Sequence, residues 1–292
     1  MTPNRSSKII TKKPPWLKKR LPGGSEQEAV RALLSKDRLH TVCQEAKCPN
    51  IWECFSHNTA TFLIMGSHCT RNCRFCAVSY GPAMPPDREE PIRIAEAVQQ
   101  MQLSYVVITS VTRDDLPDGG AACFAKTIHE IRKKIPDILV EVLIPDFQGN
   151  KISIRSVVDA QPDILNHNIE TVPRLYDSVR PQAVYRRSLE LLKEVHLYDP
   201  ALPTKSGLML GLGERSEEID ATLKDLLDAG CRILTLGQYL QPSTQHLPVS
   251  RFIPPEEFDI WRKRALEFGF SKVASGPFIR SSYHAKTLFQ AL

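Results

Sequence analysis

Short apolar runs alternate along most of the chain with stretches in which apolar residues return every three or four positions. The runs are nearly continuous and rich in β-branched residues, as parallel strands covered by helices are. The runs predict strands at residues 59–66, 104–111, 138–145, 163–170, 206–213 and 232–240, and the periodic stretches predict helices at 89–102, 121–135, 150–161, 184–198 and 216–230.

Strands separated by helices predict right-handed βαβ units around a parallel sheet. No glycine-rich dinucleotide motif follows the first strand, which favours a curved, incomplete barrel over a Rossmann sheet. The expected fold class is therefore α/β, a partial (β/α)6 TIM-like barrel with N- and C-terminal extensions. We expect a flexible basic tail over 1–13, an N-terminal extension over 14–58, the barrel over 59–253, and a C-terminal helix and tail over 254–292.

The composition is that of an ordinary globular protein, with 42% hydrophobic and 24% charged residues. No apolar run reaches the roughly 18 residues of a membrane span. The basic start has no apolar core of a secretory signal, so we expect a cytoplasmic protein without a membrane partner. Clustered cysteines are then metal ligands or redox groups rather than disulfides. The net charge of +5 favours an acidic partner without selecting one, and a solvated basic tail is the alternative.

Six of the eight cysteines lie in two trios. Cys69, Cys73 and Cys76 have C-x3-C-x2-C spacing and follow the first predicted strand, so they lie at the end of the barrel where chemistry occurs. Three thiolates without a nearby fourth suit a 4Fe-4S cluster with one open iron. Zinc is the alternative, but structural zinc normally has four ligands, and His68 is poorly placed beside Cys69 to be the fourth.

The second trio, Cys43, Cys48 and Cys54, has C-x4-C-x5-C spacing. It is incomplete as a zinc site, and as a second iron-sulfur cluster it needs another ligand from elsewhere or an open iron. The remaining cysteines, Cys123 and Cys231, fall in a predicted helix and at a strand start, where we expect them to be buried as small hydrophobic residues.

The first trio, with Phe75 before its last cysteine, resembles the signature of the radical S-adenosylmethionine (SAM) enzymes. The resemblance implies that SAM chelates the open iron and that an electron from the cluster cleaves it to a 5′-deoxyadenosyl radical. It also implies a partial barrel of the radical SAM type, in agreement with the strand pattern.

Two further segments are similar to parts of that family. GLMLGLGE, residues 207–214, is similar to the G-x-I-x-G-x-x-E strand motif near the adenine, although close packing of the glycines would also explain it. NHNIE, residues 166–170, ends the fourth strand with polar groups suited to ribose hydroxyls or the amino acid portion, although an ordinary polar loop is the alternative. The expected SAM contacts are Phe75, Thr109, Asn168, Glu170, Met209 and Gln238.

The order of the two trios resembles one subfamily, the lipoyl synthases. The similarity extends from about Pro14 to Ala285 and includes LHTVCQEAKCPNIWEC, TSVTRDDLPDGG and GPFIRSSYHA. In that subfamily the second serine of R-S-S-Y, Ser282 here, is the fourth ligand of an auxiliary 4Fe-4S cluster, whereas the serine pair alone would suggest only a polar tail. Two departures, Ser67–His68 for an often acidic position and Phe55 for a frequent tryptophan, affect no ligand.

The resemblance implies insertion of two sulfur atoms at C6 and C8 of a lysine-bound octanoyl chain, with one SAM consumed for each and the auxiliary cluster as sulfur donor. It implies as partners an octanoylated lipoyl carrier domain (an E2 subunit or the glycine cleavage H protein), a ferredoxin or flavodoxin electron donor, an iron-sulfur cluster carrier and no nucleic acid. An acidic carrier domain would suit the net positive charge. RPQAVYRR, residues 180–187, could line the site, guide the peptide or be a solvated helix start.

Two other functions compete with this interpretation. A methylthiotransferase acting on tRNA would normally carry further domains, for which 292 residues leave no room. An iron-sulfur scaffold or a zinc module would explain neither the barrel nor the strand motif at residues 207–214.

Overall fold

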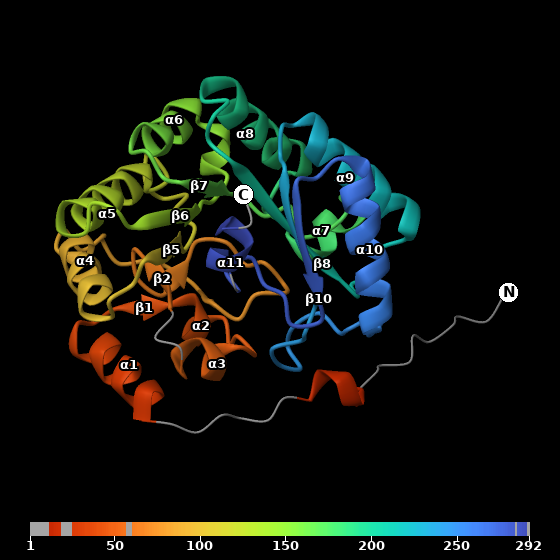
Figure 1. Ribbon diagram of the computed structural model, residues 1–292, viewed down its shortest axis with the longest axis horizontal. Coiled ribbons are helices and arrows are strands. Elements are labelled where there is room, and N and C mark those ends of the chain that lie inside the picture. Colours follow the sequence, from red (N-terminus) through yellow and green to blue (C-terminus); the bar gives the residue numbers. More distant parts are fainter. Residues whose placement is uncertain (1–11, 19–24, 57–59, 284, 291–292) are drawn as a thin grey trace, which may run out of the picture.

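The computed structural model describes residues 12–18, 25–56, 60–283 and 285–290 (Figure 1). Within these ranges one curved sheet has the strand order β1-β2-β5-β6-β7-β8-β9-β10. The first strand is antiparallel to its neighbour, and every other neighbouring pair is parallel. The strands are β1 (His40–Thr41), β2 (Thr61–Ile64), β5 (Tyr105–Ser110), β6 (Leu139–Leu143), β7 (Ile164–Asn166), β8 (Thr204–Leu210), β9 (Ile233–Gln238) and β10 (Lys272–Gly276).

The helices between the strands lie outside the arc of the sheet, as Figure 1 shows. Their apolar stripes and the outward-facing residues of the strands form the main core, in which Ile94 and Val98 lie near Phe62 and Ile108 at 0 to 1% exposure. All the predicted strands and the predicted helices are present, which confirms the α/β class and the six βα units. The helices are α4 (Glu90–Gln100), α5 (Ala121–Lys134), α6 (Lys151–Asp159), α8 (Tyr185–Tyr198), α9 (Ser216–Asp228) and α10 (Pro255–Phe268).

The C-terminal extension contributes more than the helix and extended tail expected. Its segment after α10 forms β10, which pairs with β9 in parallel from Lys272 opposite Ile233 to Gly276 opposite Gly237. This strand holds only two apolar side chains and is largely half-buried, so its apolar pattern is weak. The barrel sheet therefore continues past residue 253, the boundary predicted from the sequence.

The N-terminal extension adds helices beside β1. They are α1 (Ser25–Lys36), α2 (Val42–Glu45) and α3 (Ile51–Ser56), and a short 3-10 helix, η1, precedes them at Pro15–Leu17. The basic tail predicted over 1–13 falls, up to residue 11, outside the described residues. A two-stranded sheet, β3 (His68–Cys69) with β4 (Ser79–Tyr80), follows β2 and lies beside the first-trio loop.

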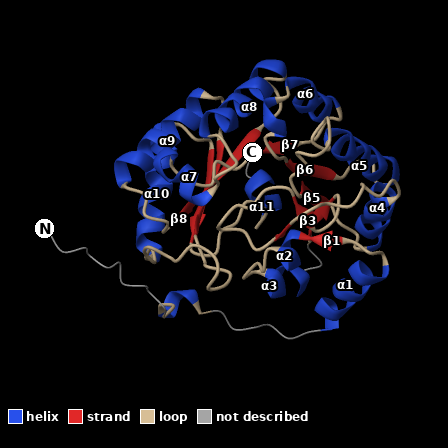
Figure 2. Ribbon diagram, turned by 180° about the vertical axis from the view of Figure 1, so that it is seen from behind, coloured by secondary structure: helices blue, strands red, loops and turns tan. Residues whose placement is uncertain are grey.

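The last helix, α11 (Ala285–Gln290), lies inside the arc in both views (Figures 1 and 2). Ala285 is buried against Tyr105, Val107 and Ile164, and Lys286 Nζ donates a 2.6 Å hydrogen bond to Ser104 Oγ. These contacts are at the start of the strands, so α11 fills that end of the barrel. The loops after the strands are left to form the other end.

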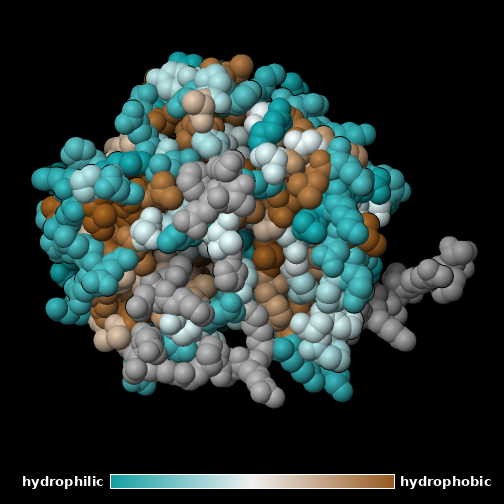
Figure 3. All heavy atoms as spheres, in the orientation of Figure 1, coloured by the Kyte–Doolittle hydropathy of each residue, from teal (hydrophilic) through white to brown (hydrophobic). Residues whose placement is uncertain are grey.

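The surface in the orientation of Figure 1 is mostly hydrophilic over the outer helices, with hydrophobic side chains gathered nearer the middle (Figure 3). In the described part of the chain, no helix is both long enough and apolar enough to cross a membrane.

Candidate functional site

The first-trio loop, residues 69–76, follows β2 and is bound to the loops after three other strands. Thr70 N donates to Thr112 O at 3.0 Å, after β5. Arg74 N donates to Val179 O at 2.9 Å, after β7, and His246 Nε2 donates to Cys76 O at 3.0 Å, after β9. The loop therefore lies at the carboxyl end of the barrel strands, as predicted.

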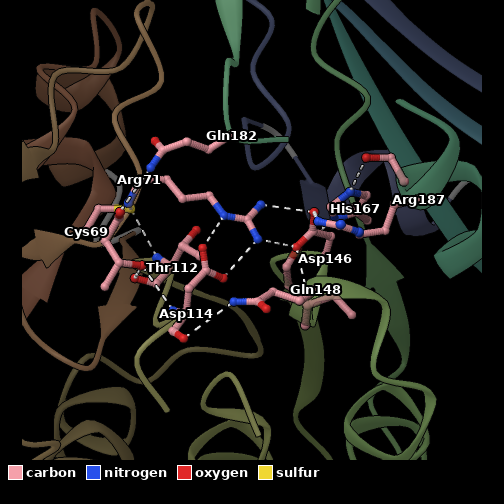
Figure 4. A network of polar contacts seen from close by, with 12 residues as sticks. Cys69, Arg71, Thr112, Asp114, Asp146, Gln148, His167, Gln182 and Arg187 are labelled. Atoms are coloured by element: carbon pink, nitrogen blue, oxygen red, sulfur yellow. Dashed lines mark hydrogen bonds and ion pairs between the residues drawn. The ribbon is translucent and has the colours of Figure 1, made fainter. Parts of the chain in front are cut away.

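Arg71, inside this loop, is the centre of a buried polar network (Figure 4). Its guanidinium binds Asp114 through Nε at 2.6 Å and Nη2 at 2.9 Å, and Asp146 through Nη1 at 3.0 Å and Nη2 at 2.6 Å. Asp114 follows β5 and Asp146 follows β6. Burial alone would raise the pKa of Asp146, but the hydrogen bonds and charge of Arg71 outweigh it and hold this pKa well below its usual range.

The sulfur of Cys69 accepts two backbone hydrogen bonds in this region. Arg71 N lies 3.4 Å and Thr112 N 3.3 Å from Cys69 Sγ. Thr70 Oγ1 ties the two segments together, because it donates to Thr112 O at 2.9 Å and accepts from Asp114 N at 3.0 Å.

None of the eight cysteines, all of which lie in the described ranges, forms a disulfide. Burial raises the pKa of Cys73, that of Cys76 to about 12 and that of Cys43 to about 11. These thiols therefore carry protons at neutral pH unless a metal displaces them. Cys231 is buried in the core and Cys123 packs half-buried against it, in keeping with their expected role as small hydrophobic residues.

Asn168 and Glu170 lie after β7, beside β8. Asn168 Nδ2 donates to Glu170 Oε1 at 3.0 Å and to Ser281 Oγ at 3.1 Å. Asn168 Oδ1 is buried and has no hydrogen-bond partner among the described residues. A Cβ on Gly207 would approach that oxygen to 2.7 Å, so glycine leaves the space in front of it open. Burial raises the pKa of Glu170, because the desolvation of its carboxylate outweighs nearby positive charge.

The other expected SAM contacts differ in how their polar atoms are used. Thr109 Oγ1, in β5, donates a 2.9 Å hydrogen bond to Leu143 O, in the neighbouring strand β6. Gln238 Nε2 donates to the carbonyls of Leu210, Tyr239 and Arg251, and its Oε1 accepts from Ile253 N at 2.7 Å, so this side chain already links three segments of backbone. Phe75 and Met209 are half-buried, in the first-trio loop and in β8.

The segment 180–187 points partly into the site and partly to solvent. Arg180 Nη1 donates to Asn168 O at 3.1 Å, and Arg187 Nη1 lies 3.4 Å from Asp146 Oδ2. Arg186, by contrast, is exposed and pairs with Glu190 on its own helix. Arg186 therefore fits the solvated helix start, Arg180 and Arg187 contact groups after β7 and β6, and guidance of a peptide stays a prediction.

The second trio is carried by the short helices α2 and α3 and the turn between them. Cys43 is in α2, Cys54 is in α3, and Cys48 N donates to Cys43 O at 3.0 Å. Thr41 Oγ1 caps α2 by accepting from Gln44 N at 3.3 Å. Cys43 is buried, whereas Cys48 and Cys54 are half-buried.

The C-terminal turn, residues 277–283, lies against this trio. Asn50 Nδ2 donates to Phe278 O at 2.7 Å, and Tyr283 OH donates to Glu53 Oε1 at 2.5 Å. The turn closes through a 3.0 Å bond from Tyr283 N to Arg280 O, with Ser282 between them.

Arg280 in the C-terminal turn lies within electrostatic reach of both Cys48 and Glu170. Its pKa is lowered because burial outweighs the attraction of these two groups. The turn therefore connects the region of the second trio with the region after β7, where Asn168 contacts Ser281.

The donor set fits iron-sulfur chemistry, since each trio offers three thiols that are not in disulfides. In addition, the buried Oδ1 of Asn168 has no hydrogen-bond partner among the described residues and can accept one from a polar ligand. Over the described ranges, no three His, Cys, Asp or Glu side chains converge on one metal-ion position. The two cluster assignments and the individual SAM contacts remain predictions.

Sequence reasoning missed the partners that hold the first-trio loop. Arg71, Asp114 and Asp146 stand far apart along the chain, and their charges alone do not predict that they meet. The only available signal was their position, because each follows a different predicted strand, and the carboxyl ends of parallel strands share one edge.

A family model described as the radical SAM superfamily matches residues 63–226. Lipoyl synthase of Desulfotalea psychrophila is 59% identical over 95% of this chain and 93% of its own length. Lipoyl synthase of Caldanaerobacter subterraneus is 56% identical over 95% of this chain and 97% of its own length. That of Vibrio parahaemolyticus is 53% identical, with coverage of 98% and 89%.

Two solved structures have a similar fold. Methylornithine synthase has a TM-score of 0.55 at 12% identity and covers 85% of this chain and 74% of its own. Streptococcus suis SuiB bound to S-adenosylmethionine has a TM-score of 0.52 at 10% identity, with coverage of 75% and 50%. At this identity the likeness concerns the fold alone, and it agrees with the barrel predicted from the sequence.

Proposed function

The chain belongs to the lipoyl synthases, sulfurtransferases of the radical SAM superfamily, and from this premise we propose that it inserts sulfur at C6 and C8 of an octanoyl chain bound to a lysine of a carrier protein. In this proposal each trio of cysteines holds a 4Fe-4S cluster, and the two clusters have different tasks.

Cys69, Cys73 and Cys76 would hold the first cluster, with one iron open to SAM. The binding of SAM would engage the unpaired Oδ1 of Asn168 and the polar end of Glu170, which lie on the same side of the barrel as the first-trio loop. The contacts of this loop with Thr112, Val179 and His246 would keep its cysteines in fixed positions while SAM binds.

Cys43, Cys48 and Cys54 would hold the second, auxiliary cluster, with Ser282 as its fourth ligand. When bound, the first cluster would supply the electron that cleaves SAM to a 5′-deoxyadenosyl radical, and the auxiliary cluster would supply the inserted sulfur. An oxygen ligand is harder than a thiolate and binds iron of such a cluster less well, so the serine would mark the place where the cluster opens.

The observation that carries the proposal is the place of the C-terminal turn. It contacts the helix of Cys54 through Tyr283 and Glu53, and it contacts Asn168 through Ser281. Arg280 in the same turn has both Cys48 and Glu170 as electrostatic neighbours. An octanoyl chain held beside this turn would have the radical source on one side and the sulfur source on the other.

The proposed partners follow from this reaction. The octanoyl group would arrive on a lipoyl carrier domain, either an E2 subunit or the glycine cleavage H protein, and an acidic carrier would be attracted by the net charge of +5. Electrons would come from a ferredoxin or flavodoxin, and an iron-sulfur carrier would rebuild the consumed cluster. We place the reaction in the cytoplasm.

The test is the mass of an octanoyl-lysine peptide after anaerobic incubation with the reconstituted protein, SAM and a reductant. We expect a gain matching two sulfur atoms, and none with Cys43→Ala. Cleavage of SAM with an unchanged peptide would show that the substrate is a different molecule. Absence of SAM cleavage by protein that holds both clusters would refute the radical assignment.

A further inference from the structure

The clamp formed by Arg71, Asp114 and Asp146 joins the first-trio loop to the loops after β5 and β6. The guanidinium makes two hydrogen bonds to each carboxylate, and the side chains of Arg71 and Asp146 are only 4% and 1% exposed. Bidentate pairs of this kind fix the orientation of both partners, and removing one partner leaves a buried charge unpaired.

The clamp fixes two backbone segments that both donate to the same sulfur. Arg71 N and Thr112 N each donate to Cys69 Sγ, and Asp114 lies two residues after Thr112. The bond of Arg71 to Asp114 therefore holds the two donor segments against each other. The hydroxyl of Thr70 links the same two segments, because it donates to Thr112 O and accepts from Asp114 N.

The clamp brings little net charge to the cysteines. Asp114 and Asp146 carry two negative charges, and Arg71 with Arg187, 3.4 Å from Asp146, carries two positive ones. Its effect on a neighbouring group is therefore expected through the position of the donors rather than through a local field.

We infer that Arg71 is a positioning residue that raises the reduction potential of the radical SAM cluster by holding two N–H donors on Cys69 Sγ. Reduction adds negative charge to a cluster, and hydrogen bonds to its sulfur ligands stabilise that charge. This role of Arg71 rests on the proposed ligation of the cluster by Cys69. It would explain why an arginine of the first-trio loop is buried between two aspartates.

The test is an anaerobic redox titration followed by electron paramagnetic resonance. Replacing Cys43, Cys48 and Cys54 by alanine first leaves a single cluster to observe. In that parent, Arg71→Lys keeps the charge but loses the two-carboxylate geometry. We expect the equilibrium constant for one-electron reduction to fall about tenfold, which is a potential about 59 mV lower.

Asp114→Asn tests whether the position of the donors or the charge of the clamp sets the potential. It should disturb the fold less than a change at Arg71, since the Asp114 side chain is 26% exposed and that of Arg71 4%. Losing a negative charge would by itself raise the potential, whereas loosening the two donors lowers it. We expect a lower potential, and a higher one would overturn the inference. Arg132→Lys, in an arginine–aspartate pair with Asp163 near the start of β7, is the matched control and should leave the potential unchanged.

The outcomes distinguish the two proposals. A parent that takes up no cluster would refute ligation by Cys69, and with it both the proposed function and the role of Arg71. A parent with a reducible cluster and an Arg71→Lys variant with the same potential, at equal iron content, would refute only the role of Arg71.

Discussion

The two cysteine trios are held in different ways. The first-trio loop follows a strand of the barrel and is bound by groups from the loops after β5, β6, β7 and β9. The second trio sits on two short helices and the turn between them, outside the parallel strands. Its neighbours Asn50 and Glu53 bond to groups of the C-terminal turn that are 228 and 230 residues away along the chain.

This difference teaches that the first-trio loop belongs to the barrel itself, whereas the region of the second trio is completed by the C-terminal turn from far along the chain. The first site is therefore expected to survive changes at the chain ends. The second site should depend both on its own cysteines and on the docking of the C-terminal turn.

The largest expected effect comes from removing one proposed cluster ligand from each trio. Cys73→Ala should abolish SAM cleavage, whereas Cys48→Ala should retain cleavage and lose the sulfur product by more than roughly 100-fold, because a direct ligand matters more than the outer-shell partners, whose loss costs up to about 100-fold. Chromatography of 5′-deoxyadenosine and mass spectrometry of the peptide measure both in one reaction. Loss of cleavage in Cys48→Ala, at full occupancy of the first cluster, would break the division of tasks.

The next effect concerns Ser282, the proposed fourth ligand of the auxiliary cluster. Ser282→Cys should retain a cluster but lose product at least roughly 10-fold, because thiolate binds iron of a cluster more tightly than an alkoxide does. Iron and sulfide analysis confirms retention of the cluster before the peptide is assayed. Normal sulfur insertion by this variant would show that the serine is not the opening point.

A smaller effect is expected from weakening the docking of the C-terminal turn. Tyr283→Phe removes the hydrogen bond to Glu53, worth about 1 kcal/mol, so the auxiliary iron should be lost to a chelator roughly fivefold more readily. Tyr198→Phe, which removes a hydrogen bond to Asp159 on the outer helices, is the matched control. Equal iron loss in both variants would mean that the turn does not support the auxiliary site.

The smallest effect is one of pH on the barrel side. His167, after β7, is buried, which lowers its pKa to about 4, and it bonds Ile144 O at 2.8 Å and Ser188 Oγ at 2.9 Å. Its pKa is below that of an unfolded histidine, so its stabilising contribution is present above about pH 6.5 and is lost as pH falls toward 4. Between pH 7 and pH 6 the free energy of unfolding should fall by about 0.7 kcal/mol from this residue.

Urea unfolding of the protein without clusters measures this pH effect, and His167→Gln should remove the share that comes from the histidine. The charged groups facing His167, namely Arg180, Asp146 and Arg71, stay ionised over this range because burial and pairing shift none of their pKa values into it. An unchanged pH dependence in His167→Gln would contradict the assignment.

The sequence predicts the barrel because its strands are short, apolar and separated by periodic helices. β10 was missed, because a strand at the edge of the sheet with half-buried positions carries little apolar pattern. α1 to α3 and α11 were missed too, since they depend on packing against the rest of the chain more than on their own periodicity.

The site was predictable only in part. The spacing of each trio is local, so the two groups of cysteines can be recognised in the sequence, and the position of the first after β2 follows from the strand order. The meeting of Asn50 with Phe278 and of Arg71 with two aspartates depends on tertiary structure, and no local pattern encodes it. Ser282 entered the prediction through the resemblance to a family and not through its own surroundings.

The measurement that tests the central claim most directly is the isotope of the inserted sulfur. The protein is reconstituted with heavy-isotope sulfide, freed of excess sulfide and incubated with SAM, reductant and the octanoyl peptide. We predict at most one lipoyl group per chain, with both sulfur atoms heavy and two molecules of 5′-deoxyadenosine for each product. Cys48→Ala, which keeps a labelled first cluster, should transfer no sulfur. Light sulfur in the product, or continued turnover without added sulfide, would contradict the account.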